Sequence, residues 1–218
     1  MRRPEICVCL DACGKDSLDN VVKRFLKLGI DSFEVGTTLM HMRGMGIVTE
    51  LRTLLGAGCD LGVDLKTQDG CYHHLRRARE YGGDCGTVCV ANNAAAFVTA
   101  PRAQREFGVG AVADLYSVPV EAMAETAARA ARCGFQEIRL NCGYDAYIQS
   151  GGAVDECAGF QEVAREAGSA RVSVCCYSEA GAERALRLGA AKLVLCDPLV
   201  NDRHIMAMIR KLQGGVSV

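Results

Sequence analysis

Short apolar runs alternate with amphipathic segments along the whole chain. The amphipathic segments are typical of helices: in the first, Ser17 can cap the N-terminus of an apolar stripe that runs from Leu18 to Leu26. Pro101 is expected to break or bend the helix-like segment 94–107. Eight runs rich in Val, Ile, Leu, Cys and Ala are short enough for buried strands, at residues 5–11, 30–36, 59–64, 85–91, 109–114, 135–141, 171–176 and 191–196.

The alternation also repeats. A glycine ends a helix-like segment a few residues before a strand-like run at Gly29, Gly82, Gly134 and Gly189, in steps of 53, 52 and 55 residues. Four copies of a unit with two strands and two helices make eight βα units. This count predicts an α/β fold, a closed (β/α)8 TIM barrel that forms a single domain over residues 1–218, with a doubly wound open sheet as the alternative.

Composition narrows the class of protein. Half of the 218 residues are hydrophobic and 23% are charged, which suits a large core, and the net charge of −1 gives no reason to expect a nucleic-acid partner or an acidic membrane surface. There is no apolar run long enough for a membrane span and no signal-peptide pattern after Met1, so the expectation is a cytoplasmic protein.

Thirteen cysteines are many for this length. They lack the paired C-x2-C spacing of zinc sites, and many stand in strand-like runs where Val or Ala would serve. We interpret most of them as small buried hydrophobic residues in a reducing compartment.

In a barrel of this kind, chemistry belongs at the carboxyl ends of the strands. Asp64 and Lys66 would point to the same side of a strand, where each would hold the other in its charged form. Such a group can bind a cation and stabilise an oxyanion, whereas the plain alternative is a set of solvated carboxylates and a surface ion pair. The strand ends carry, in order, Asp11, Glu34, Asp64 with Lys66, Asn92, Asp114, Asn141, Cys175-Cys176 and Cys196-Asp197.

Four stretches carry a resemblance to a known family: Val8-Cys9-Leu10-Asp11, Phe33-Glu34-Val35-Gly36-Thr37, Asp64-Leu65-Lys66-Thr67-Gln68-Asp69 and Val112-Ala113-Asp114-Leu115. In order and spacing they resemble the orotidine-5′-phosphate decarboxylase superfamily. The closest branch is that of 3-hexulose-6-phosphate synthase and 3-keto-L-gulonate-6-phosphate decarboxylase. The resemblance covers nearly the whole chain and implies a (β/α)8 barrel that works as a homodimer with active sites at the interface.

The same resemblance implies roles for individual residues. It makes Glu34 and Asp64 ligands of Mg²⁺ or another divalent cation, and Lys66 the lysine beside an enediolate. Asp69 would reach into the partner subunit's site, and Asp11 would contact a substrate hydroxyl. A metal ion and a lysine at these positions would stabilise the developing charge.

Two departures from the family pattern cluster near the C-terminus. The family's phosphate site, a Gly-Gly and a Gly-Arg pair, falls here on Cys175-Cys176 and Cys196-Asp197, so a phosphate would meet a carboxylate instead of an arginine. The family's histidine after the sixth strand is Asn141, which cannot act as an acid or base near neutral pH. Tyr144, Asp145 or a water molecule could replace that histidine.

The sequence therefore predicts an enzyme, a divergent Mg²⁺-dependent carbon–carbon lyase of carbohydrate metabolism. It would act as a decarboxylase or aldolase, through an enediolate, on a small sugar-like or keto-acid substrate. It would not bind that substrate through the family's usual phosphate site. One alternative is a non-catalytic barrel kept as a sensing, scaffolding or partner subunit. Another is a thiol or soft-metal site made by Cys142, Cys175, Cys176 and Cys196. The expected catalytic residues are Asp11, Asp64, Lys66 and Asp69, and the expected substrate contacts are Thr37, Asp114, Asn141, Tyr144, Cys176 and Asp197.

Overall fold

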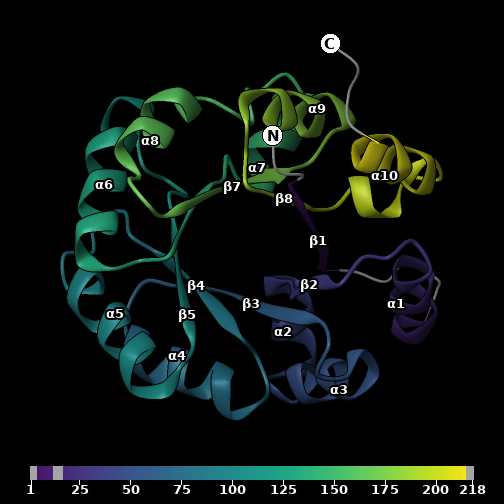
Figure 1. Cartoon of the computed structure of the whole chain (residues 1–218), viewed down its shortest axis with the longest axis horizontal. Coiled ribbons are helices and arrows are strands. Elements are labelled where there is room, and N and C mark those ends of the chain that lie inside the picture. Colours follow the sequence, from purple (N-terminus) through teal and green to yellow (C-terminus); the bar gives the residue numbers. More distant parts are fainter. Residues whose placement is uncertain (1–3, 12–16, 215–218) are drawn as a thin grey trace.

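The computed structural model describes residues 4–11 and 17–214, and it shows a closed barrel of eight parallel strands in sequence order (Figure 1). All eight strands lie within or next to the predicted runs, so the predicted TIM barrel is confirmed. Their bounds are β1 Glu5–Leu10, β2 Ser32–Val35, β3 Asp60–Thr67, β4 Cys85–Cys89, β5 Gly110–Asp114, β6 Glu137–Leu140, β7 Arg171–Cys176 and β8 Lys192–Leu195.

The helices surround the barrel in a ring (Figure 1). Ser17 caps the first helix as predicted, since its hydroxyl accepts a hydrogen bond from the Asn20 amide. The expected break at Pro101 is wrong, because one helix runs through it from Ala96 to Phe107. The helices are α1 Leu18–Leu26, α2 Thr37–Arg43, α3 Gly46–Leu55, α4 Cys71–Glu80, α5 Ala96–Phe107, α6 Val120–Cys133, α7 Tyr144–Gln149, α8 Phe160–Glu166, α9 Glu179–Leu188 and α10 Ile205–Gly214, with a 3-10 turn η1 at Leu199–Asn201.

The glycines that mark the repeat share one backbone conformation. Gly29, Gly82, Gly134 and Gly189 have φ values of 73°, 101°, 99° and 90°. Residues with a Cβ avoid this left-handed region, which lets the chain turn sharply from a helix into the next strand. The period in the sequence is therefore a period of helix-to-strand turns.

The two faces of the strands differ in chemistry. The outward faces are apolar and pack against the helices, as Phe33 and Val35 do in β2. The inward faces carry cysteines, small residues and buried charges, among them Glu34, Asp114 and Arg139. Because the strands alternate inward and outward side chains, the barrel has an apolar shell around a polar, partly charged interior.

The strand cysteines are buried except Cys85, which is partly exposed, and all cysteines in the described ranges are free thiols. None of the described helices has the length and hydropathy that crossing a bilayer would require.

Candidate active site

A cavity of about 450 Å³ opens at the carboxyl ends of the strands. Seven of the predicted site residues line it together, although they come from distant parts of the sequence: Asp11, Glu34, Thr37, Asp64, Lys66, Tyr144 and Asp197. Cys9, Thr38, Tyr116, Gly143, Asp145, Cys175, Tyr177 and Cys196 complete its wall. The structure thus brings most of the predicted site into one place.

Four predicted site residues do not line this cavity. Asp114 and Asn141 are buried behind its wall. Cys176 is fully buried and points out of the barrel, where its thiol bonds to the Val174 carbonyl, while its neighbour Cys175 faces the cavity. Asp69 is exposed, and its carboxylate accepts a hydrogen bond from the Gly70 amide.

Asp64 and Lys66 form an ion pair at the end of β3, as expected from their spacing. Thr37, the first residue of α2, donates its hydroxyl to Asp64 Oδ2 at 2.8 Å, and Thr87 of β4 donates to Oδ1 at 2.8 Å. Both carboxylate oxygens of Asp64 are therefore held, one from α2 and one from β4, and the pair has a fixed orientation.

An irregularity in the sheet places the lysine. The pairing of β3 with β4 shifts register between Val63 and Thr67, and Lys66 has a φ of 41°. Its amide donates to the Thr87 hydroxyl at 2.9 Å instead of joining the ladder. A bulge of this kind redirects a side chain, and here it turns the ammonium toward Asp64.

The electrostatics keep this pair charged. Burial alone would raise the pKa of Asp64, but Lys66 and Arg139 outweigh it and lower that pKa. Burial would lower the pKa of Lys66, but Asp64 and Asp114 outweigh it and raise that pKa far above its usual value. Lys66 is therefore a cation at any working pH and cannot act as a base or attack a carbonyl as a neutral amine.

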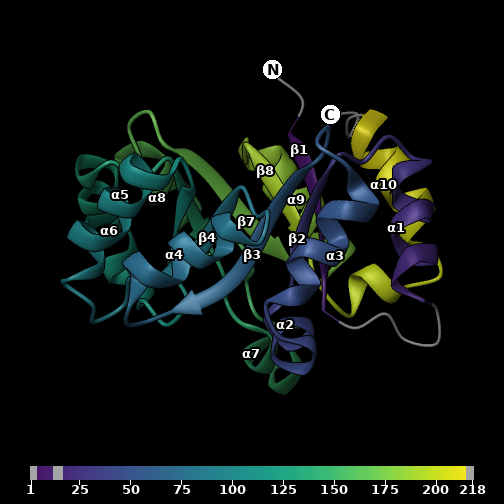
Figure 2. The same cartoon turned by 90° about the horizontal axis from the view of Figure 1, so that it is seen from below.

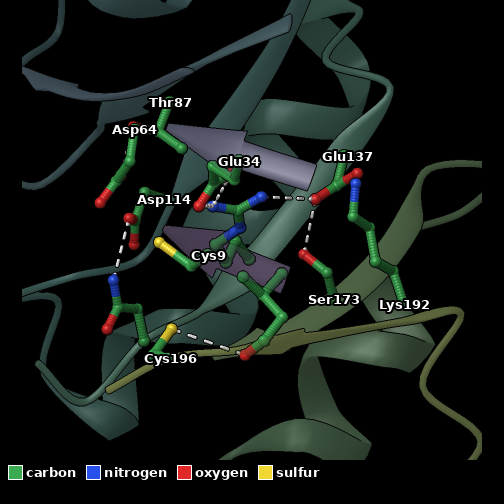
Figure 3. A network of polar contacts seen from close by, with 12 residues as sticks. Cys9, Glu34, Asp64, Thr87, Asp114, Glu137, Ser173, Lys192 and Cys196 are labelled. Carbon is green, nitrogen blue, oxygen red and sulfur yellow. Dashed lines mark hydrogen bonds and ion pairs between the residues drawn. The ribbon is translucent and has the colours of Figure 1, made fainter. Parts of the chain in front are cut away.

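Glu34 has a partner that the sequence analysis missed. Arg139 of β6 donates from Nη1 to both carboxylate oxygens of Glu34, at 2.9 and 2.7 Å, inside the barrel (Figure 3). The two side chains are 1% and 2% exposed. Burial raises the pKa of Glu34, and Arg139 offsets part of that rise.

Arg139 also links Glu34 to a second buried carboxylate. Its Nη2 donates to Glu137 Oε1 at 3.2 Å, and Ser173 donates to the same oxygen at 2.8 Å. Glu137 and Arg139 occupy alternate positions of β6, between the apolar residues Ile138 and Leu140. That alternation of charged and apolar residues was the signal in the sequence for charges that point into the barrel.

These contacts do not fit a divalent cation held by Glu34 and Asp64. The guanidinium of Arg139 already uses both oxygens of Glu34, and Asp64 is used by Lys66, Thr37 and Thr87. Two unit charges about 4 Å apart interact by ~4 kcal/mol near a protein surface, so Arg139 would repel a divalent ion strongly. Within the described ranges, no three His, Cys, Asp or Glu side chains form a group that could hold a metal ion.

Asn141, which stands where the resemblance expects a histidine, is fixed by three hydrogen bonds. Its amide nitrogen donates to Asp114 Oδ2 at 3.1 Å, while its oxygen accepts from the Tyr177 hydroxyl at 2.9 Å and from the Gly143 amide at 3.0 Å. Burial raises the pKa values of Asp114 and Tyr177. This network shapes the wall of the cavity, and Asn141 itself cannot act as an acid or base near neutral pH.

The thiols of Cys9, Cys175 and Cys196 lie close together in the barrel and line the cavity. Cys196 contacts both of the others through its thiol, and its pKa is raised well above its usual value by these thiols and by burial. The positions on which the resemblance places a phosphate site thus include the thiols of Cys175 and Cys196, and Asp197 lines the cavity next to them.

Three solved structures share this architecture. A 3-hexulose-6-phosphate synthase matches with a TM-score of 0.82 at 20% sequence identity, over 98% of this chain and 100% of that one. A 3-keto-L-gulonate-6-phosphate decarboxylase from Vibrio cholerae matches with a TM-score of 0.74 at 21% identity, over 97% of each chain. An orotidine 5′-phosphate decarboxylase from Lactobacillus acidophilus matches with a TM-score of 0.66 at 16% identity, over 98% of each chain.

The chain has the fold of these lyases. The resemblance drawn from the four sequence stretches is therefore confirmed in the fold. No family model and no curated protein sequence matches the chain.

Proposed function

We propose that this protein is a carbon–carbon lyase, a decarboxylase or aldolase, that stabilises an enediolate beside Lys66. The observation that carries the proposal is the charged Asp64–Lys66 pair, which lines the cavity at the carboxyl end of β3. Structures that share the fold are named as decarboxylases and as a synthase, which supports this class of reaction.

The chemistry needs a fixed positive charge near a carbonyl oxygen. In decarboxylation of a β-keto acid with a hydroxyl group on its α-carbon, the bond from that carbon to the carboxylate breaks, CO₂ leaves and the electron pair moves onto the carbonyl oxygen, which gives an enediolate; the carbon later takes up a proton. In the aldol direction, the enediolate forms when the hydroxyl-bearing carbon next to the carbonyl loses a proton to a base in the cavity, Asp145 or a water molecule. In both, the ammonium of Lys66 in a largely buried site stabilises the negative oxygen as it develops.

Lys66 would act as a permanent cation and not through a Schiff base. Imine formation requires a neutral amine, and the neighbouring carboxylates raise the pKa of Lys66 far above its usual value. Asp64 would orient the ammonium and keep it charged. The proposed reaction does not use Mg²⁺, because the guanidinium of Arg139 already contacts both carboxylate oxygens of Glu34.

The charges on the cavity wall favour a substrate without a phosphate group. Asp11, Asp145 and Asp197 line the cavity, while no arginine does in the part of the chain that the structure describes. A phosphomonoester would lack the arginine that usually neutralises it. A ketose or β-keto acid of small size suits the volume and the hydroxyl groups of Thr37 and Tyr144.

We also propose that the protein works as a homodimer whose sites lie at the interface. The support is Asp69, which belongs to the Asp-x-Lys-x-x-Asp stretch but is exposed and lies outside its own chain's cavity. A carboxylate in this position is available to the site of a partner subunit.

A turnover screen tests the function. Purified protein is incubated with β-keto acids, ketoses with and without phosphate, and aldehyde pairs, and CO₂ or carbonyl products are measured. Lys66→Ala is expected to lower kcat by about 100- to 1000-fold. The control is Lys23→Ala, which removes an exposed lysine that pairs with Asp19 on α1. Equal rates for Lys66→Ala and the unmodified protein would refute the proposed role of Lys66.

A non-catalytic barrel is the second candidate, and Asn141 is the observation that favours it. The residue that replaces the family's histidine is hydrogen-bonded on both amide atoms. If no substrate in the screen turns over while small polyols or keto acids bind to the cavity, the protein senses or carries such molecules.

A further inference from the structure

We propose that Arg139 takes the place of a divalent cation in this barrel, so that the site carries its positive charge on side chains and excludes metal ions. The inference rests on the proposed function only for the location of the site. Its test measures metal binding and not turnover, so each idea can fail without the other.

The geometry of Glu34 is the first support. One nitrogen of Arg139 donates to both oxygens of this carboxylate, which are the oxygens that a metal ion at the cavity floor would use. Because Glu34 lines the cavity and Arg139 does not, the guanidinium approaches the carboxylate from beneath, inside the barrel.

Burial makes the arrangement permanent. Arg139 is 1% exposed and is also held by Glu137, so its side chain has no path into solvent. An arginine keeps its charge under all ordinary conditions.

The balance of charge is the second support. Near the cavity floor, both carboxylates that the resemblance makes metal ligands already contact a cation: Glu34 contacts Arg139, which it shares with Glu137, and Asp64 contacts Lys66. Hard divalent ions take carboxylate oxygens as ligands, and here those oxygens already contact side-chain cations. Asp114, the next buried carboxylate, is directed toward the Asn141 amide and the Tyr116 backbone.

The Nε atom of Arg139 makes no hydrogen bond. It is buried and has no partner within the described structure. The contacts of Nη1 and Nη2 with the two carboxylates therefore determine the position of the guanidinium, and Nε remains without an acceptor. We expect this arrangement of an arginine whose role is to supply positive charge at Glu34.

The decisive variant is Arg139→Gln, which removes the cation but keeps a polar side chain. Binding of Mn²⁺ is measured by electron paramagnetic resonance, and binding of Mg²⁺ by calorimetry. The unmodified protein should bind neither ion at a free concentration of about 1 mM, whereas Arg139→Gln should gain close to one site per chain. Arg139→Gln combined with Glu34→Gln should lose that site again.

A matched control removes an arginine at the other end of the barrel. Arg171 bonds to Glu5 and Glu137, so Arg171→Gln also frees carboxylates but away from the cavity, and it should not create a site. If Arg139→Gln does not fold, the unmodified protein and Glu34→Gln decide the question by themselves. One Mn²⁺ bound per unmodified chain and lost in Glu34→Gln would overturn the proposal, and no bound Mn²⁺ in the unmodified protein upholds it.

Discussion

Removing Arg139 should destabilise the fold strongly, because it leaves Glu34 charged and unpaired in the barrel. The pair is almost fully buried, with side chains 1% and 2% exposed and nitrogen–oxygen distances of 2.9 and 2.7 Å. Breaking a buried pair from one side costs about 3–5 kcal/mol. Since a domain of this kind has ~5–15 kcal/mol of stability in total, Arg139→Met should lose about a fifth or more of it.

A double-mutant cycle separates the pair from the rest of the barrel. Glu34→Gln alone leaves Arg139 with Glu137 as its remaining carboxylate, and should cost about 2–4 kcal/mol. The double variant Glu34→Gln/Arg139→Met removes both charges and should lose less than the sum of the single losses by at least ~2 kcal/mol. Glu137 keeps its bond from Ser173 in every variant.

The assay is urea unfolding at pH 7, followed by circular dichroism, with the free energy extrapolated to water for all four proteins. Two results would contradict the reasoning. One is a loss below about 1 kcal/mol for Arg139→Met, and the other is additive losses in the double variant. Either would mean that the guanidinium and the carboxylate are not in contact in solution.

Two further predictions concern acid stability and the cavity rim. The pKa of Glu5, lowered to about 2 by Lys192 and Ser32 despite burial, lies below its usual 4.5. The folded state therefore gains stability above pH 4.5 that is lost as the pH falls toward 2. Because the titrations stop at pH 3 and solvent screens this partly exposed group, Glu5→Gln should remove about 1–2 kcal/mol of the dependence in urea titrations from pH 7 to 3. The variant Gly36→Ala would bring its Cβ to 2.3 Å from the Asp11 carboxylate and displace that side chain, so turnover or ligand binding should fall at least ~10-fold. The control is Gly46→Ala, whose Cβ meets nothing within 4 Å, and it should change neither turnover nor ligand binding.

The sequence was sufficient for the fold because the fold depends on repeated local signals. Apolar runs of strand length and turn glycines such as Gly29 and Gly82 recur once per unit, and each reports on backbone geometry that neighbouring residues determine. Pro101 shows the limit of local reasoning. The helix continues through it because packing of the surrounding apolar residues, Phe97 among them, outweighs one missing hydrogen bond.

The site was predicted in part, for a different reason. The positions of residues along the predicted strands correctly placed Asp64 and Lys66 at the mouth of the barrel. They did not determine which of two adjacent residues at a strand end faces inward. At the end of β7, Cys175 faces the cavity and Cys176 does not. A shift of one residue in a strand exchanges the two faces, and only the closed barrel fixes that register.

The interior charges form three levels along the barrel. This arrangement explains why the family motif on its own predicts that Glu34 binds a metal ion. Lowest, Glu5 bonds to Lys192 and Arg171. At the middle level Arg139 joins Glu137 to Glu34, both of which Figure 3 labels, and at the mouth Lys66 holds Asp64. Figure 2 shows β2 and β3, the neighbouring strands that carry Glu34 and Asp64.

Each level contains its own cation: Asp64 is paired with Lys66 of its own strand, and Glu34 is paired with Arg139 of a distant strand. A local motif shows the carboxylate and not its partner 105 residues away. Because the cation at Glu34 is part of the chain, any anion that binds above it meets a charge that cannot be exchanged or chelated. Chemistry at this site should therefore be insensitive to EDTA, in the same samples in which loss of Lys66 abolishes it.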